Sequence, residues 1–379
     1  MKPSDVQKRW STDQLIMGVE VPEWFNLLQR NKYRIDPTYL HRAAWISAWS
    51  LPITLAGRSE DAMYGRQLAA MEGLSPTPLF VLGHWRSGTT HLHNLLGRAP
   101  GHTFTNVMQV VFPTCFLVAD QILPKLLPNA LGETRTYDNV KQGWHEAAED
   151  EIALAKLTGL SPYISFMFPG NASKYEKYID FLEASGDERA RWKDAFLYFL
   201  KKVSLQTGGK RIVVKSCTHT ARIRLLLEMF PNAKFVHIHR HPYEVYASTL
   251  HMRRHTDWEN FFQVPEMDWD VERKRQTLLL GQRIFDRVIE DRHLIPKENF
   301  VEIRYEELCG NEFSWIERIY KQFEFDNWPA TKAALAPYVE GLKGYQRNAL
   351  TIGEEDREDV YREWRAVFDE YGYDREYAV

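Results

Sequence analysis

The chain has 379 residues, of which 44% are hydrophobic and 26% are charged, and its net charge is −3. This balance is typical of a globular protein with a large core, and it excludes a whole-chain basic field that would recruit nucleic acid. There is no apolar run long enough to span a membrane, and the three distant cysteines indicate neither a disulfide framework nor a zinc site. With a polar start that lacks a secretory signal, we expect a cytoplasmic protein.

The first part of the chain, from about Val21 to Met71, shows helical patterns and no residues with an obvious chemical role. Its large apolar residues gather at helical spacing: Trp24, Leu27, Leu28, Tyr39, Trp45 and Trp49. We expect residues 1–75 to form a helical extension packed on the core, and residues 76–379 to form the catalytic domain.

A glycine-bracketed turn follows the first apolar run, Leu79–Leu82, and a helical pattern follows the turn. Gly83 and Gly88 enclose the turn with the spacing of a nucleotide P-loop, a geometry that points backbone N–H groups at an anion. A P-loop NTPase would continue with lysine, but this chain continues with Thr89, and Arg86 supplies the cation instead. The pattern therefore predicts a phosphate-binding loop not built for a magnesium-nucleoside triphosphate. A tight connection without a ligand is the alternative.

Three further apolar runs read as strands, over Arg211–Lys215, Lys234–His239 and Phe300–Tyr305. Between the first two of these we expect a helix that Thr218 or Thr220 caps at its start. Pro242 suits the first turn of the next helix. Strands that alternate with helices predict an α/β fold: a single domain with a parallel sheet flanked by helices, P-loop-like, with helical additions at both ends.

The chain ends with a pattern typical of one amphipathic helix. Its charged run, Glu354–Asp359, reads as the solvated face. The side that we expect to be buried carries Tyr361, Trp364, Phe368 and Tyr371.

The loop resembles the 5′-phosphosulfate loop of sulfotransferases that use 3′-phosphoadenosine 5′-phosphosulfate (PAPS), in the bacterial and protein-tyrosine branch of that family. The resemblance implies PAPS as co-substrate, no metal, and in-line transfer of a sulfuryl group. It places these loop residues against the donor: His84, Trp85, Arg86, Ser87, Gly88, Thr89 and Thr90.

A second segment, Phe230–Pro242, resembles the part of the family that binds the donor's 3′-phosphate. Arg240 leaves the carboxyl end of a predicted strand, where open α/β sheets bind ligands, and Ser248 follows on a helix. The resemblance assigns the 3′-phosphate to these two residues, and an arginine with a hydroxyl is good phosphate chemistry. A surface arginine and a serine bonded to its own helix are the alternatives.

The segment Val214–Thr220 resembles a Lys-Ser-Pro-x-His motif of bacterial relatives, with Cys217 in place of the proline. It keeps Lys215, which we expect to stabilise the leaving phosphate. It also keeps His219, which is either a catalytic residue or a residue that caps the following helix or pairs with a carbonyl. A lysine that extends from a strand end to solvent is the alternative for Lys215.

Two later segments also resemble the family. Tyr305, in Ile303–Leu308, matches an aromatic residue near the donor nucleotide. A Gly-Tyr-x-Lys-Asn motif is matched by Tyr345, Arg347 and Asn348, with Lys343 adding charge, and we expect that loop to close over the donor.

The catalytic base is predicted among three adjacent carboxylates, Glu149, Asp150 and Glu151, which resemble a Glu-Asp-Glu-x-Ala-Leu motif of relatives. Adjacent carboxylates raise one another's pKa, which suits a base. An exposed acidic helix start is the alternative, with His145, His84 and His219 in reserve as the base.

The acceptor is expected to be an apolar or lipid-like alcohol. The segments Val107–Leu117 and Ile122–Leu127, together with Phe166–Phe168, are interpreted as the apolar wall of its binding pocket. The leading hypothesis is a PAPS-dependent sulfotransferase acting on a small hydroxylated molecule. A P-loop kinase or NTPase, or a non-catalytic nucleotide-binding protein, are the alternatives. A peripheral membrane contact and a homo-oligomer stay open.

Overall fold

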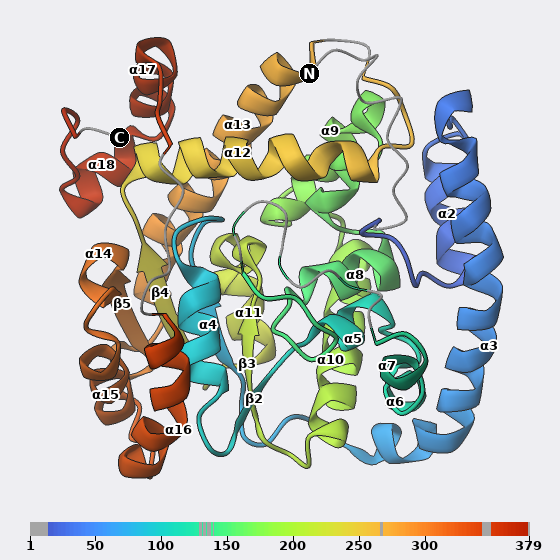
Figure 1. Cartoon of the computed structure of the whole chain (residues 1–379), viewed down its shortest axis with the longest axis horizontal. Coiled ribbons are helices and arrows are strands. Elements are labelled where there is room, and N and C mark those ends of the chain that lie inside the picture. The colour runs from blue at the N-terminus through green and yellow to red at the C-terminus, as the bar shows by residue number, and fades with distance from the viewer. Residues whose placement is uncertain are drawn as a thin grey trace. The chain divides into compact units, whose positions relative to one another are not determined.

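The computed structural model describes residues 14–128, 131, 134, 138, 140–265, 268–342 and 350–377. The chain divides into two compact units that are interleaved in sequence. Unit 1 takes Met1–Leu74, Asn106–Gln206 and His251–Arg275, and unit 2 takes Ser75–Thr105, Thr207–Leu250 and Gln276–Val379. Figure 1 shows the helices and strands of both units with their labels.

Unit 2 contains a five-stranded parallel sheet in the order β2-β3-β1-β4-β5. Its strands are β1 (Leu79–Leu82), β2 (His102–Phe104), β3 (Arg211–Lys215), β4 (Lys234–His239) and β5 (Phe300–Arg304). Four of them were predicted. The short edge strand β2 was missed, and β5 ends one residue earlier than expected because Tyr305 begins a helix. The prediction of a parallel sheet flanked by helices is confirmed.

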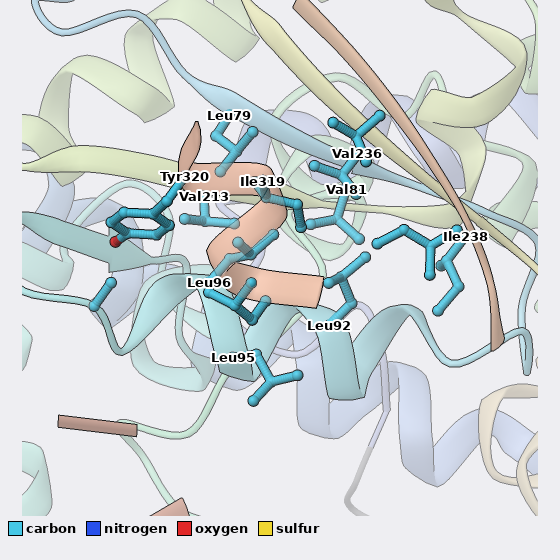
Figure 2. Close-up of a cluster of buried hydrophobic side chains, with 14 of the residues drawn as sticks. Leu79, Val81, Leu92, Leu95, Leu96, Val213, Val236, Ile238, Ile319 and Tyr320 are labelled. Atoms are coloured by element: carbon cyan, nitrogen blue, oxygen red, sulfur yellow. The ribbon is translucent and has the colours of Figure 1, made fainter. Parts of the chain in front are cut away.

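The helices of unit 2 are α4 (Thr89–Gly97), α11 (Ile223–Met229), α14 (Tyr305–Leu308), α15 (Glu312–Gln322), α16 (Trp328–Gly341), α17 (Glu354–Glu363) and α18 (Arg365–Tyr371). One sheet face packs against α4, α15 and α16 through the cluster drawn in Figure 2, in which Leu92, Leu96 and Ile319 meet the strand residues Val81 and Val236. Phe80 lies on the other face and stacks on Phe235. A parallel sheet buried on both faces explains why the strands read as continuous apolar runs.

Two local expectations in unit 2 are wrong. Neither Thr218 nor Thr220 caps α11, because both lie in a preceding 3-10 helix over Cys217–Ala221, and the N-cap residue is Arg222. The single helix expected near the end of the chain is two helices, because the helical conformation is interrupted at Trp364, between α17 and α18. Trp364 and Phe368 are nonetheless buried as predicted. Pro242 opens α12 as expected.

The described residues of unit 1 form helices joined by loops, and none of them belongs to the sheet. Its helices are α2 (Val21–Arg30), α3 (Leu40–Ala70), α5 (Val107–Val111), α6 (Phe116–Ala119), α7 (Leu123–Leu126), α8 (Glu151–Thr158), α9 (Ser173–Glu176) and α10 (Gly186–Gln206). Two helices, α12 (Pro242–Asn260) and α13 (Trp269–Asp291), contribute residues to both units. None of the described helices is long and apolar enough to cross a membrane.

Two buried lysines hold the α5–α6 region of unit 1 by its backbone. Lys156 donates to the carbonyl oxygens of Val110 (2.8 Å) and Val111 (3.1 Å), and burial lowers its pKa well below the usual value. Lys202 donates to the carbonyl oxygen of Pro113 (2.7 Å) and pairs with the buried Glu60. Lysine side chains are rarely fully buried unless paired, so these contacts fix the course of a segment that is otherwise interrupted by prolines.

Candidate active site

The glycine turn after β1 forms the predicted strand–loop–helix unit in unit 2. Gly88 is the N-cap residue of α4 and has φ +98°, and a Cβ atom there would lie 2.3 Å from the Tyr305 ring. Gly83 is held from both sides by Thr220, whose hydroxyl accepts from the Gly83 N–H (2.7 Å) and donates to its carbonyl (3.1 Å). The loop therefore needs glycine at Gly88 for both its backbone angle and the close approach of Tyr305.

Inside the loop, the turn is closed by Ser87, whose hydroxyl donates to the carbonyl oxygen of His84 (2.7 Å). Arg86 has φ +69°, a left-handed conformation that costs energy for a residue with a Cβ atom. The carbonyl oxygen of Arg86 accepts from Arg240 Nη1 (3.2 Å), which supports that conformation.

Three of the residues predicted to bind PAPS contact one another directly. Arg86 Nε donates to Ser248 Oγ (2.9 Å), and Arg240 contacts the Arg86 backbone. Strand β4 places Arg240 beside the loop that follows β1, because these two strands are neighbours in the sheet. Helix α12 then brings Ser248 back toward the same loop. Two guanidinium groups and a hydroxyl thus converge at the carboxyl end of the sheet, where parallel sheets bind ligands.

Two further residues, Lys215 and Tyr305, lie at the carboxyl ends of strands in this sheet. Lys215 is the last residue of β3, is 3% exposed, and reaches Thr90 Oγ1 at 3.4 Å. The Tyr305 ring lies under the guanidinium of Arg240 at 4.6 Å, a cation–π contact. Thr89, the neighbour of Thr90, points toward Cys217, with Oγ1 and Sγ 3.8 Å apart. The cysteine in place of the motif's proline thus packs directly against the loop.

Sequence reasoning missed the carboxylate that accompanies these cations. Glu244 lies one helical turn after Arg240 and forms an ion pair with it, and the Tyr377 hydroxyl donates to Glu244 (2.6 Å). Tyr377 also stacks on His241 with ring centroids 4.1 Å apart. The spacing of Arg240 and Glu244 could have indicated an i, i+4 pair, but no local signal connects either residue to Tyr377.

Two histidines that were considered for the site are buried. The ring of His84 is 1% exposed, stacks on Phe285 with centroids 5.0 Å apart, and has Trp85 against its edge. Burial lowers the pKa of His84 to about 4, so the ring is neutral at physiological pH. His219 is 0% exposed and meets the ring of Phe80 edge-on.

The acidic cluster lies in unit 1 at the start of α8. Asp150 and Glu151 are both 0% exposed, so the alternative of a solvated helix start is wrong for these two residues. Glu149 is partly buried and accepts from the Tyr163 hydroxyl (2.5 Å). His145, the reserve base, is exposed and contacts Asp120 at 2.7 Å. Asp150 and Glu151 are therefore interior carboxylates, whose burial costs free energy unless partners offset it.

The apolar segment of unit 1 is part core and part surface. Met108, Phe116, Met167 and Phe168 are fully buried, whereas Ile122, Leu126 and Leu127 are between 47% and 68% exposed. A cavity of about 140 Å³ lies at Pro113 and Thr114, with Lys156 and Glu20 in its lining.

Tyr345, Arg347, Asn348 and Lys343 lie outside the described residues. Among the residues that are described, no group of three or more histidines, cysteines or carboxylates has an arrangement that could hold a metal ion.

Comparison with known proteins identifies the family of this fold and loop. Residues 78–330 match the model of the sulfotransferase family. The chain is 30% identical over 368 residues to the omega-hydroxy-beta-dihydromenaquinone-9 sulfotransferase Stf3 of Mycobacterium tuberculosis, covering 97% of this chain and 93% of the relative, and equally to that of Mycobacterium bovis. The chain belongs to the sulfotransferase family.

Solved structures agree on the fold of this sulfotransferase. STF9 from Mycobacterium avium superposes with a TM-score of 0.65 and 18% identity, covering 94% of this chain and 98% of that one. STF1 from Mycobacterium tuberculosis gives a TM-score of 0.63 and 17% identity, covering 91% and 90%. The resemblance that the loop residues predicted is therefore confirmed at the level of family and fold.

Proposed function

We propose that the protein transfers the sulfuryl group of PAPS to a hydroxyl group of an apolar, lipid-like acceptor. The observation that carries the proposal is that Arg240 and Ser248 converge on Arg86 of the glycine loop, at the carboxyl end of the sheet, in a chain of the sulfotransferase family. Charge-assisted hydrogen bonds from arginine to phosphate are among the strongest polar contacts in proteins.

The donor fits this set of groups by its own chemistry. PAPS carries two anionic ends. The backbone N–H groups of the loop and the N-terminus of α4 are available to one of them, together with Lys215 at the end of β3. We assign the 3′-phosphate to Arg240 and Ser248, as the family motif implies. In this assignment the phosphate competes with Glu244 for Arg240, and Lys215 stabilises the charge that builds on the leaving phosphate.

The acceptor half of the proposal uses unit 1 and the named relative. A relative at 30% identity over nearly the whole chain is named for a hydroxylated dihydromenaquinone, which is a long apolar molecule with an alcohol at its end. The apolar segment around α5 to α7 suits an acceptor of that character. We place the proton acceptor among Glu149, Asp150 and Glu151, since sulfuryl transfer needs the acceptor hydroxyl in line and a base to take its proton.

The donor assignment is tested by calorimetry with 3′-phosphoadenosine 5′-phosphate. Arg86→Ala should weaken binding by roughly 10- to 150-fold, which corresponds to the loss of a hydrogen bond to a charged group of about 1.5–3 kcal/mol. Arg240→Ala should remove the preference over adenosine 5′-phosphate, which lacks the 3′-phosphate. Arg318→Ala, an exposed arginine on α15, is the matched control. Unchanged affinity in Arg86→Ala removes this residue from the site.

The reaction itself is tested by mass spectrometry of hydroxylated lipid extracts incubated with PAPS and a metal chelator. A sulfate mass gain on an apolar alcohol supports the proposal. Transfer that requires magnesium and ATP, with no use of PAPS, would instead identify a kinase or NTPase and overturn it.

A further inference from the structure

Helix α3 of unit 1 does not separate polar from apolar residues as an ordinary surface helix does. Its buried side mixes the apolar residues Ala43, Ile46, Ile53 and Leu68 with the polar residues Arg42, Ser50, Thr54 and Glu60, all at most 7% exposed. Two of these polar groups bond within the unit: Arg42 donates to the carbonyl oxygens of Trp258 and Phe261 at 2.9 Å each, and Glu60 accepts from the Val118 N–H at 3.0 Å. A surface helix normally turns its apolar face inward, so the outer face of α3 calls for an explanation.

The outer face is apolar over the first half of the helix. Between Ala43 and Gly57 every exposed residue is apolar: Ala44, Trp45, Ala48, Trp49, Leu51, Pro52 and Leu55. The large ones are well exposed, with Leu51 at 58% and Leu55 at 54%, and the rings of Trp45 and Trp49 pack edge-on with centroids 5.6 Å apart. Leu40 and Met63 extend the strip at 55% and 64% exposed. A contiguous apolar patch of this kind marks an interaction surface.

Charge on the second half of α3 indicates what the patch meets. Arg58 and Arg66 are exposed and share the outer face with Leu51, Leu55 and Met63 by helical spacing. The nearest exposed acid on the helix, Asp61, lies at the edge of that face and accepts from the Tyr198 hydroxyl (3.2 Å). An apolar strip with paired tryptophans, followed by two exposed arginines on the same face, fits a bilayer interface with anionic headgroups.

We propose that the outer face of α3 docks this sulfotransferase onto an anionic lipid surface, with the helix axis lying in the plane of the interface. The inference deepens the proposed function, because a lipid-like acceptor is delivered from a membrane rather than from water. Docking itself requires no turnover and no donor, so it can fail or succeed independently of that function.

The test is co-flotation of the full-length protein with vesicles of phosphatidylcholine that contain one part in three of phosphatidylglycerol. The wild-type protein should float with these vesicles and much less with pure phosphatidylcholine. The double variant Trp45→Ser/Trp49→Ser should bind about tenfold more weakly or worse, because two large rings no longer enter the interface. The variant Arg58→Gln/Arg66→Gln should lose the dependence on phosphatidylglycerol.

A matched control removes exposed apolar residues elsewhere, with Leu182→Ser in unit 1 and Leu294→Ser in unit 2, which are 51% and 39% exposed in the wild type. This control should float like the wild type. Turnover of a short, water-soluble alcohol should be unchanged in the tryptophan variant, which shows that it is folded.

The competing occupant is a second copy of the chain, and light scattering after size exclusion distinguishes it. A dimer that the tryptophan substitutions dissociate, with no flotation of the wild type, would overturn the proposal. Equal flotation of the wild type and the tryptophan variant would overturn it as well.

Discussion

The buried ion pair of Lys202 and Glu60 offers a sharp test of the energetics of unit 1. The two side chains are 0% and 1% exposed, and Lys202 also donates to the Pro113 carbonyl and lies 4.6 Å from the centre of the Phe116 ring. Burial lowers the pKa of Lys202 and raises that of Glu60, while the attraction between the two charges opposes both shifts. Each charge is therefore tolerated only because the other is present.

Replacing the lysine by methionine keeps most of the packing volume and removes the charge. Lys202→Met leaves a buried carboxylate without its cation, which should lower the free energy of unfolding by about 3–5 kcal/mol. That is a large part of the roughly 5–15 kcal/mol that holds a typical domain together. The double variant Lys202→Met/Glu60→Met buries no charge and should recover part of the loss, but not all of it, because the Pro113 carbonyl and the Val118 N–H lose their side-chain partners.

Urea unfolding followed by far-UV circular dichroism gives the comparison. The matched control is Lys321→Met, because Lys321 pairs with Glu317 at 2.7 Å on α15 but the two side chains are 75% and 38% exposed. An exposed pair should contribute less than about 1 kcal/mol. If Lys202→Met costs no more than Lys321→Met, or if the double variant is as unstable as the single one, the argument about burial is refuted.

Three further predictions concern the loop, the sheet edge and the base. Gly88→Ala and Gly101→Ala both place a Cβ atom at positive φ (+98° and +80°), but only the first meets a neighbour, the Tyr305 ring at 2.3 Å. Gly88→Ala should therefore cost about 1–3 kcal/mol more in unfolding free energy and abolish nucleotide binding, and equal costs would contradict the close packing. Burial alone would raise the pKa of Glu302, but the His237 hydrogen bond and the charges of His237 and Arg292 outweigh it and lower the pKa to about 2. The stability from Glu302 is thus present above its ordinary pKa of 4.5 and lost as the pH falls toward 2, so Glu302→Gln should flatten the acid side of a stability–pH curve by about 1–2 kcal/mol. Of Glu149→Gln, Asp150→Asn and Glu151→Gln, one should lower kcat by about 10²–10⁴-fold with donor affinity unchanged. Normal turnover in all three amides would exclude the cluster.

The strands of unit 2 were predictable because burial on both faces leaves an unbroken apolar run, as in Leu79–Leu82. Strand β2 could not be found this way, since His102–Phe104 is three residues long and none of them is fully buried. The prediction that Thr218 or Thr220 caps α11 was wrong because both lie in the preceding 3-10 helix, and the Thr220 hydroxyl hydrogen-bonds to Gly83, 137 residues away.

The convergence of Arg86, Arg240 and Ser248 was predictable from family motifs, and the parallel pairing of β1 with β4 explains how these residues meet. Glu244 and Tyr377 were not, because their contact joins positions 133 residues apart and follows no short pattern. The polarity of α3 was also out of reach, because helical spacing groups Trp45 and Trp49 on one face without revealing that this face is the outer one.

The interleaving of the two units has a practical consequence for anyone who wishes to dissect this enzyme. The chain passes from one unit to the other at 74/75, 105/106, 206/207, 250/251 and 275/276, and the last two passages fall inside α12 and α13. No single cut in the gene can therefore deliver either unit whole, because each unit is assembled from three separate segments of the chain. Exchanging either unit between relatives will require several separate cassettes. Loss of expression in a shortened clone will say nothing about which half carries the chemistry.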